Sequence, residues 1–208
     1  MLVVVVGAIL IGCISGFEND LNGTINKIHL TVYAETQCSD TTHFFRKHLL
    51  PTHKTLGNHI MLKVIPFGKA SCTYDEDDFK CSCQHGKNEC DLNILQNCIL
   101  YQITDPIQYL PLIYCIQGKR NYEVAVRECL DEIEEQVADG IIACGKGKKG
   151  RRLLYIAGKK TASLSPLLNF VPWVTINHQR QSSFTYSLEK EICKQLNITA
   201  EPCSKYIA

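Results

Sequence analysis

The groups in this chain most able to do chemistry are its cysteine thiols. The 208 residues include 12 cysteines, and three of them, Cys83, Cys90 and Cys98, fall within sixteen positions. Cysteine at this density forms a disulfide framework, ligates a metal or belongs to a redox centre. Each possibility implies a different compartment and function, so the rest of the chain has to distinguish among them.

The N-terminal segment predicts export. Residues 1–16 are apolar, carry no charged side chain and end in small residues, as a secretory signal peptide cleaved near Ser15 or Gly16 does. The run is shorter than the roughly 20 residues of a membrane span. An uncleaved anchor and a lipoprotein cleavage site at Cys13 are the alternatives, and both are weaker.

Two glycosylation sequons, at Asn22 and Asn197, also favour passage through the secretory pathway. Removal of the signal peptide leaves a chain long enough for one domain with its own core, residues 17–208. We therefore expect a secreted or lysosomal glycoprotein that has no membrane association after cleavage.

The charge balance excludes some partners. Lys plus Arg number 22 and Asp plus Glu number 21, so the bulk charge predicts neither a nucleic-acid nor a membrane partner. Two local runs stand out, an acidic one at 74–78 and a basic one at 146–152. Both are interpreted as solvated loops, with a protease processing site or a contact for anionic glycans as the alternative for the basic loop.

The parity of the cysteines predicts one free thiol. Eleven cysteines remain once Cys13 leaves with the signal peptide, and in an oxidising compartment they form disulfides. Because eleven is odd, at least one thiol is free or pairs with another chain. The local spacing suggests one pair, Cys193 with Cys203. The other candidates for disulfides are Cys72, Cys81, Cys83, Cys90, Cys98, Cys115, Cys129 and Cys144.

A zinc site is the alternative for part of this set. Cys81, Cys83, His85 and Cys90 offer four ligands, but their spacing does not match a paired zinc motif, and export favours oxidation over metal binding. We therefore expect no metal. His85 is then interpreted as a turn histidine that hydrogen-bonds to the backbone.

Hydrophobic periodicity predicts an α/β fold. Apolar residues alternate along the first strand and recur at helical spacing in the segments between strands. The expected elements are a strand at 27–33, a helix that ends at Pro51, a strand at 60–67, helices starting at Asp91 or Asn93, at 105–115 and at 123–135, a strand at 171–176 and a helix at 188–196. This order is the thioredoxin-like plan with an inserted helical, disulfide-rich segment at about 83–145.

Two residues of that plan are candidates for catalysis. Cys38 lies between the first strand and the first helix, where backbone N–H groups and the helix dipole stabilise a thiolate, although Asp40 opposes this. Pro172 precedes the third strand of the plan, faces the redox turn and is expected to be cis. A bridged Cys38 and an ordinary edge proline are the alternatives.

Several short motifs occur along the chain in an order that is typical of one protein family. They are Tyr33-x4-Cys38, Pro66-Phe67-Gly68-Lys69-Ala70, Cys83-Gln84-His85-Gly86-x2-Glu89-Cys90-x2-Asn93-x4-Cys98 and Val171-Pro172-Trp173-Val174. The chain resembles the gamma-interferon-inducible lysosomal thiol reductase family from about Ile28 to Cys203. This resemblance implies a thioredoxin-like fold and reduction of protein disulfides, at acidic pH, in lysosomes or outside the cell.

One position departs from the active-site pattern that the resemblance implies. The first active-site cysteine corresponds to Cys38, but its partner position holds Thr41, which cannot resolve a mixed disulfide. We expect either a slower single-cysteine oxidoreductase, resolved by an external thiol such as cysteine or glutathione and needing no other cofactor, or a catalytically faded secreted binding protein. The Thr41 hydroxyl is expected either to donate a hydrogen bond to the Cys38 sulfur or to act as a local cap.

Cys72 and Cys81 look like additions to the family pattern. They are expected to bridge the acidic loop, with a distant resolving thiol for Cys38 as the alternative. The expected partners are proteins that contain disulfides, and the oligomeric state is left open.

Overall fold

A mixed sheet organises the molecule, whose computed structural model describes residues 27–181, 187–196 and 201–206. The signal segment and both sequons lie outside these ranges. The strand order is β2-β1-β5-β6, with β1 parallel to β2 and antiparallel to β5. The strands of this sheet are β1 (Ile28–Ala34), β2 (Ile60–Pro66), β5 (Trp173–Ile176) and β6 (Gln179–Arg180). The α/β prediction is confirmed.

The first strand lies between two neighbours, which explains its composition. Val32 on β1 pairs with Val64 of β2 and with Val174 of β5, and all three side chains are buried. Apolar, β-branched residues suit such a strand because both of its edges are hydrogen-bonded and its side chains pack against helices.

The helix after β1 does not end at Pro51 as predicted. It consists of α1 (Ser39–Phe44), a π-helical turn η1 (Phe45–Leu49) and α2 (Leu50–Leu56). Pro51 occupies the first turn of α2, and the Leu50 N–H reaches back to the Phe45 carbonyl oxygen. Inside a continuous helix proline lacks the N–H that would bond to the preceding turn, and its ring crowds a carbonyl there; the wider π-helical turn before Pro51 makes room for the ring, so the helix continues.

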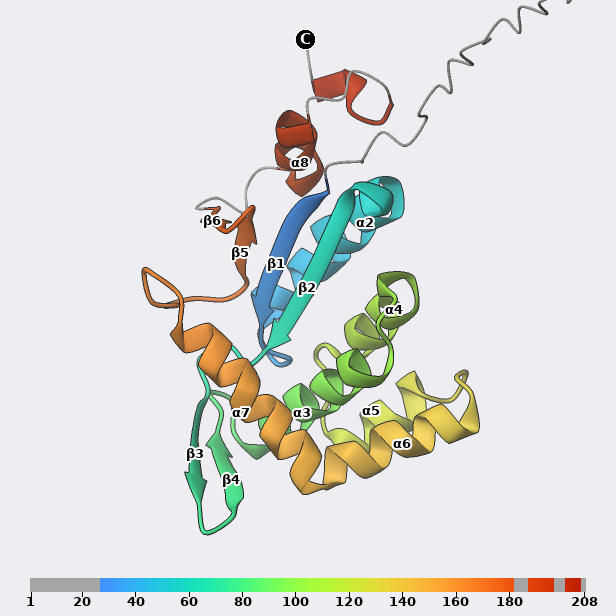
Figure 1. Ribbon diagram of the computed structural model, residues 1–208. Helices are drawn as coiled ribbons and strands as arrows, with labels where there is room; N and C mark the ends of the chain where they lie inside the picture. The colour runs from blue at the N-terminus through green and yellow to red at the C-terminus, as the bar shows by residue number, and fades with distance from the viewer. Residues whose placement is uncertain (1–26, 182–186, 197–200, 207–208) are drawn as a thin grey trace, which may run out of the picture.

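A hairpin and five helices lie between β2 and β5, so the inserted helical material continues past residue 145 (Figure 1). The hairpin consists of β3 (Ser71–Asp75) and β4 (Asp78–Ser82). The helices are α3 (Lys87–Gln102), α4 (Pro106–Ile116), α5 (Tyr122–Cys129), α6 (Glu135–Lys146) and α7 (Lys148–Ala162).

Two predicted helix boundaries in this segment are wrong. Helix α3 begins at Lys87, before Asp91 and Asn93, with Gly86 as its N-cap; the Glu89 side chain in its first turn accepts a hydrogen bond from the backbone N–H of His85 and so holds the preceding turn against the helix. The helix predicted over 123–135 ends at Cys129, after which the chain turns and Leu130 is buried.

The basic run at 146–152 is not a loop. Lys146 ends α6 and Lys148 begins α7, so most of the run is helical. Arg151 forms two hydrogen bonds with the carboxylate of Asp78, from Nε at 2.9 Å and from Nη2 at 2.7 Å. Part of the basic run therefore joins α7 to the acidic hairpin, which corrects the interpretation of both runs as solvated loops.

Helices cover the sheet from two directions (Figure 1). Helix α8 (Leu188–Leu196) packs against α2 and β1, whereas α3 and α7 pack against β2. The short helices η2 (Gly57–His59) and η3 (Ser204–Tyr206) complete the described elements. In the described ranges no helix is both long and apolar enough to cross a membrane.

Candidate active site

Cys38 is the one cysteine of the described residues that has no disulfide partner. The other ten form the pairs Cys72–Cys81, Cys83–Cys90, Cys98–Cys144, Cys115–Cys129 and Cys193–Cys203. Three predictions are confirmed: one thiol stays unpaired, Cys193 pairs with Cys203, and Cys72 pairs with Cys81 across the acidic hairpin. The distant resolving thiol is excluded in this structure because Cys72 and Cys81 bond to each other. A cysteine-based zinc site is excluded for the same reason.

The position of Cys38 suits a nucleophile. It is the N-cap of α1, with an extended backbone (φ −80°, ψ 123°), and its side chain is partly exposed. The N–H groups of the first helical turn have no partner within the helix, so their partial positive charge faces the sulfur side of the turn.

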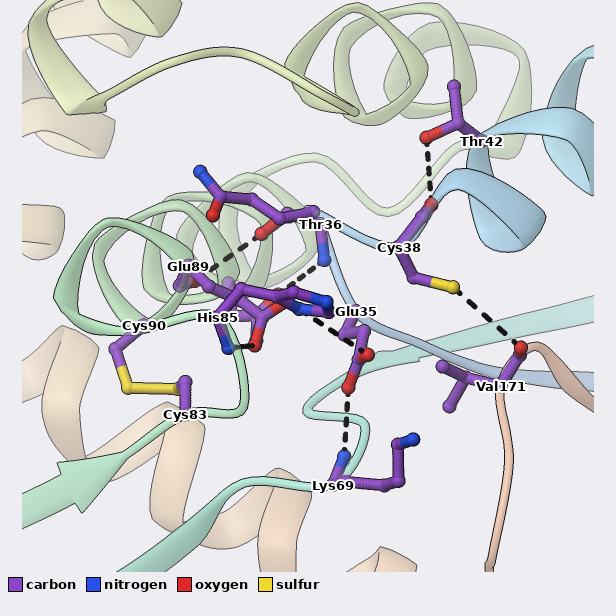
Figure 2. Close-up of polar contacts among 12 residues, drawn as sticks. Glu35, Thr36, Cys38, Thr42, Lys69, Cys83, His85, Glu89, Cys90 and Val171 are labelled. Atoms are coloured by element: carbon purple, nitrogen blue, oxygen red, sulfur yellow. Dashed lines mark hydrogen bonds and ion pairs between the residues drawn. A yellow bond between two sulfur atoms is a disulfide. The ribbon is translucent and has the colours of Figure 1, made fainter.

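The sulfur faces the loop that leads into β5. The Sγ atom of Cys38 lies 3.8 Å from the carbonyl oxygen of Val171, and Figure 2 shows it directed at that oxygen. The peptide bond between Val171 and Pro172 is cis, as predicted. Segments that are more than a hundred residues apart in sequence therefore meet at the thiol.

Thr41 does not make the hydrogen bond predicted for it. Its side chain is fully buried, and its hydroxyl has no hydrogen-bond partner. No side chain caps the start of α1; the neighbouring Thr42 hydroxyl donates to the Cys38 carbonyl oxygen at 3.0 Å, a bond back to the preceding turn. Thr41 therefore contributes a buried methyl and hydroxyl to the first turn of α1, three residues after Cys38.

A pocket of about 350 Å³ adjoins the thiol turn and the cis peptide. Burial, and then repulsion from His43, lower the pKa of His48 below its ordinary value. The ring centroids of Phe44 and His48 are 5.7 Å apart. The pocket is lined by Asp40, His43, Phe44, His48, Phe170, Val171 and Pro172. Its aromatic and imidazole walls suit an apolar side chain of a polypeptide.

Helix α3 holds the segment that leads to Cys38. The backbone N–H of Thr36 donates to Asn93 Oδ1 at 3.0 Å, and the Thr36 hydroxyl donates to the Glu89 carbonyl oxygen at 3.3 Å. Thr36 and both α3 residues are fully buried. The block from Cys83 to Cys98 thus positions the chain just before the nucleophile and does not only carry disulfides.

A cluster of acidic and imidazole groups lies beside this segment (Figure 2). His85 Nδ1 is 2.6 Å from Glu89 Oε2 and 3.7 Å from Glu35 Oε1. The predicted hydrogen bond from the His85 side chain to the backbone is therefore wrong. The carboxylate of Glu35 is buried, and its Oε2 accepts the Lys69 N–H at 3.0 Å. Burial raises the pKa of Glu35 above its ordinary value, and the Lys69 N–H partly opposes this.

Gly68 allows the chain to pass this close to Glu35. Its φ is +62°, and a Cβ atom there would lie 2.1 Å from Glu35 Oε2. The left-handed backbone and the close approach both require glycine.

Sequence reasoning missed Glu35, Thr36 and the buried roles of Glu89 and Asn93. The available signal was the polar pair Glu35-Thr36 directly after an apolar strand, because polar residues at the end of a buried strand frequently serve a site. Their partners on α3 could not be identified without the tertiary structure.

Comparison with other proteins agrees with this geometry. A profile of the family described as gamma interferon inducible lysosomal thiol reductase (GILT) matches residues 29–133. The GILT-like protein C02D5.2 of Caenorhabditis elegans is 42% identical over 184 residues, which cover 88% of this chain but only 57% of that relative. The GILT-like protein CBG03282 of Caenorhabditis briggsae is 30% identical, with 89% of this chain and 86% of that relative covered.

Solved structures support the fold. Chlamydia trachomatis DsbA superposes with a TM-score of 0.59 at 14% identity, covering 82% of this chain and 85% of that one. The MdbA thiol-disulfide oxidoreductase of Actinomyces oris also gives 0.59, at 13% identity, with 82% and 80% covered. The fold is thioredoxin-like and DsbA-like, and the chain belongs to the gamma interferon inducible lysosomal thiol reductase family.

Proposed function

We propose that this protein is a thiol-disulfide oxidoreductase that reduces or exchanges disulfides in protein substrates through Cys38. One observation carries the proposal: Cys38 is the cysteine left unpaired among the described residues, and it stands at a helix N-terminus opposite a cis proline loop. Membership of a thiol reductase family supports it.

In the first step the Cys38 thiolate attacks one sulfur of the substrate disulfide. A new bond forms between Cys38 and that sulfur, and the second substrate sulfur leaves as a thiolate that takes up a proton. Pro172 and the Val171 carbonyl line the approach and are assigned to present the substrate chain. The adjoining pocket receives an apolar side chain beside the scissile bond.

Resolution requires a thiol from outside the protein, because Thr41 has no sulfur. One external thiol, such as cysteine or glutathione, attacks the Cys38 sulfur and releases the reduced substrate; a second then frees Cys38 as the external disulfide forms. Overall, one substrate disulfide and two thiols give a substrate dithiol and one external disulfide. In exchange, a second substrate thiol performs the resolution, and no net oxidation or reduction occurs.

We propose that this chemistry takes place in the lysosome or outside the cell. The apolar segment 1–16 and the sequons Asn22 and Asn197 support secretory export, and relatives from mouse and goldfish are named lysosomal thiol reductases. The substrates are proteins that contain disulfides.

A second candidate function is favoured by Thr41, which has no sulfur and so cannot act as a resolving thiol for Cys38. This absence supports a catalytically faded interaction protein that retains the fold. The two functions differ in whether Cys38 reacts.

The test is a thiol count followed by an activity assay. Alkylation of the native protein, read by peptide mass spectrometry, is expected to label Cys38 and no other described cysteine. Reduction of a model protein disulfide by added cysteine, followed between about pH 4.5 and 7, is expected to be lost in Cys38→Ser. An unlabelled Cys38, or equal rates in the two proteins, would leave the interaction protein as the better explanation.

A further inference from the structure

We propose that Glu35, His85 and Glu89 bind a divalent transition-metal ion of the zinc class. The three side chains converge from the residue after β1, from the turn before α3 and from α3 itself, as Figure 2 shows. One ligand atom from each lies within 4.8 Å of the others. Within the part of the chain that the structure describes, this is the one cluster of three or more such residues.

The donor set suits this class of ion. One imidazole nitrogen and two carboxylates are common zinc ligands, at about 2.0–2.2 Å from the metal, so tetrahedral ligand atoms stand about 3.4 Å apart. The spacing between His85 Nδ1 and Glu35 Oε1 is 3.7 Å, already close to that value. The spacing between His85 Nδ1 and Glu89 Oε2 is 2.6 Å. Binding therefore replaces their hydrogen bond with two coordinate bonds after the side chains separate by roughly 1 Å.

A buried oxygen aimed into the cluster points to a ligand. Glu35 is 1% exposed, and its Oε1 atom is buried without a hydrogen-bond partner. A buried acceptor left unpaired costs about 1–3 kcal/mol, more if it is charged. A cation between Glu35 and Glu89 removes this cost and compensates for two buried negative charges that face a single imidazole.

A proton explains the same oxygen less well. A proton on Glu35 Oε1 needs an acceptor, but the nearby His85 Nδ1 stands 3.7 Å away and is engaged with Glu89 at 2.6 Å. The His85 imidazole therefore offers such a proton no acceptor at hydrogen-bond distance. A metal ion, by contrast, satisfies Oε1 directly.

The surroundings hold the ligands in place. The Cys83–Cys90 disulfide closes the turn that carries His85, and the His85 N–H donates to Glu89 Oε1 at 3.1 Å. Glu35 is fixed through Oε2 by the Lys69 N–H. The His85 side chain is 37% exposed, which gives an ion access from solvent. This site is separate from the thiol, whose sulfur faces Val171.

The test is zinc binding in a Cys38→Ser background, which removes the thiol as a competing ligand. Calorimetric titration with zinc chloride is expected to show one ion per chain, and zinc is expected to raise the melting temperature. Adding His85→Asn, which keeps hydrogen-bonding capacity but is a poor ligand, is expected to weaken binding by at least about tenfold and remove the thermal shift. Adding Glu35→Gln should act in the same direction.

The matched control is His178→Asn in the same background, since His178 is an exposed histidine outside the cluster. It is expected to bind zinc as the parent does. Absence of saturable binding, or binding that His85→Asn leaves unchanged, overturns the proposal. His85→Asn changes a partly exposed side chain, so it serves as the deciding variant if Glu35→Gln fails to fold. The result does not depend on whether Cys38 is catalytic.

Discussion

Asn93 Oδ1 accepts a 3.0 Å hydrogen bond from the backbone N–H of Thr36, and both residues are fully buried. This bond joins α3 to the segment between β1 and the nucleophile. A buried backbone N–H has no water to replace a lost partner, so the position of Cys38 depends on a residue more than fifty positions away in the sequence.

Asn93→Ala is expected to reduce the free energy of unfolding by about 1–3 kcal/mol, because it leaves the Thr36 N–H without a partner. Asn88→Ala is the matched control, since Asn88 is exposed on the same helix. Urea unfolding of both variants measures the difference. Equal destabilisation by the two substitutions would show that the buried hydrogen bond contributes little.

Thr41→Cys is expected to increase the rate of disulfide reduction at about millimolar cysteine by at least about tenfold. A thiol held beside Cys38 acts at an effective molarity far above that of a free thiol, with a ceiling of roughly 10⁵ M or more. The measurement is turnover of a model protein disulfide at fixed external thiol.

The control for this substitution is Thr41→Ser, which keeps the hydroxyl and adds no sulfur. It is expected to leave the rate near that of the parent. A rate increase in Thr41→Ser as large as that in Thr41→Cys would attribute the effect to space behind Cys38 and contradict intramolecular resolution.

Removal of the Cys98–Cys144 disulfide is expected to cost more stability than removal of Cys72–Cys81. The first closes a separation of 46 residues and the second of 9. The loop-entropy relation then gives about 4 and about 2.6 kcal/mol. Denaturant unfolding of the two double alanine variants compares them. The reverse order would show that the short bridge stabilises the hairpin by native contacts and not by chain entropy.

The pKa of His48 is lowered by burial and then by His43, from an ordinary 6.5. The unfolded chain therefore binds more protons in the window below 6.5, so the free energy of unfolding falls as the pH drops through it. His48→Gln is expected to flatten this dependence. Unfolding at about pH 5 and about pH 7.5 measures it. His178→Gln, at an exposed position, is expected to retain the slope of the parent; an unchanged slope in His48→Gln would assign the dependence to other groups.

The local patterns of the sequence were sufficient for much of the architecture. Alternation of apolar residues located β1 and β2, and the odd number of cysteines predicted a free thiol, because parity does not depend on how the chain folds. The ordered motifs, above all the block from Cys83 to Cys98, indicated the family, and the order of strands and helices indicated the thioredoxin-like plan. The missing sulfur at Thr41 was also evident from the residues alone.

Other features depended on contacts that local patterns do not encode. Pro51 failed as a helix end because a π-helical turn accommodates it, and α3 begins early, at Lys87, where the Glu89 side chain holds the backbone N–H of His85 in the preceding turn. The basic run became helical where Arg151 meets Asp78. In each of these three places the local sequence was compatible with more than one backbone structure, and contacts with neighbouring parts of the chain decided which one formed.

What the sequence determined by itself was the set of chemical groups: one unpaired thiol at the end of a strand, a threonine where a resolving thiol is expected, and a disulfide-rich helical segment. What only the tertiary structure decided was which groups meet. Glu35 and His85 are fifty residues apart and give no joint signal in the sequence, yet their side chains approach to 3.7 Å. The physical reason is that packing of α3 against β2, beside the end of β1, sets these distances, and that packing depends on the whole core.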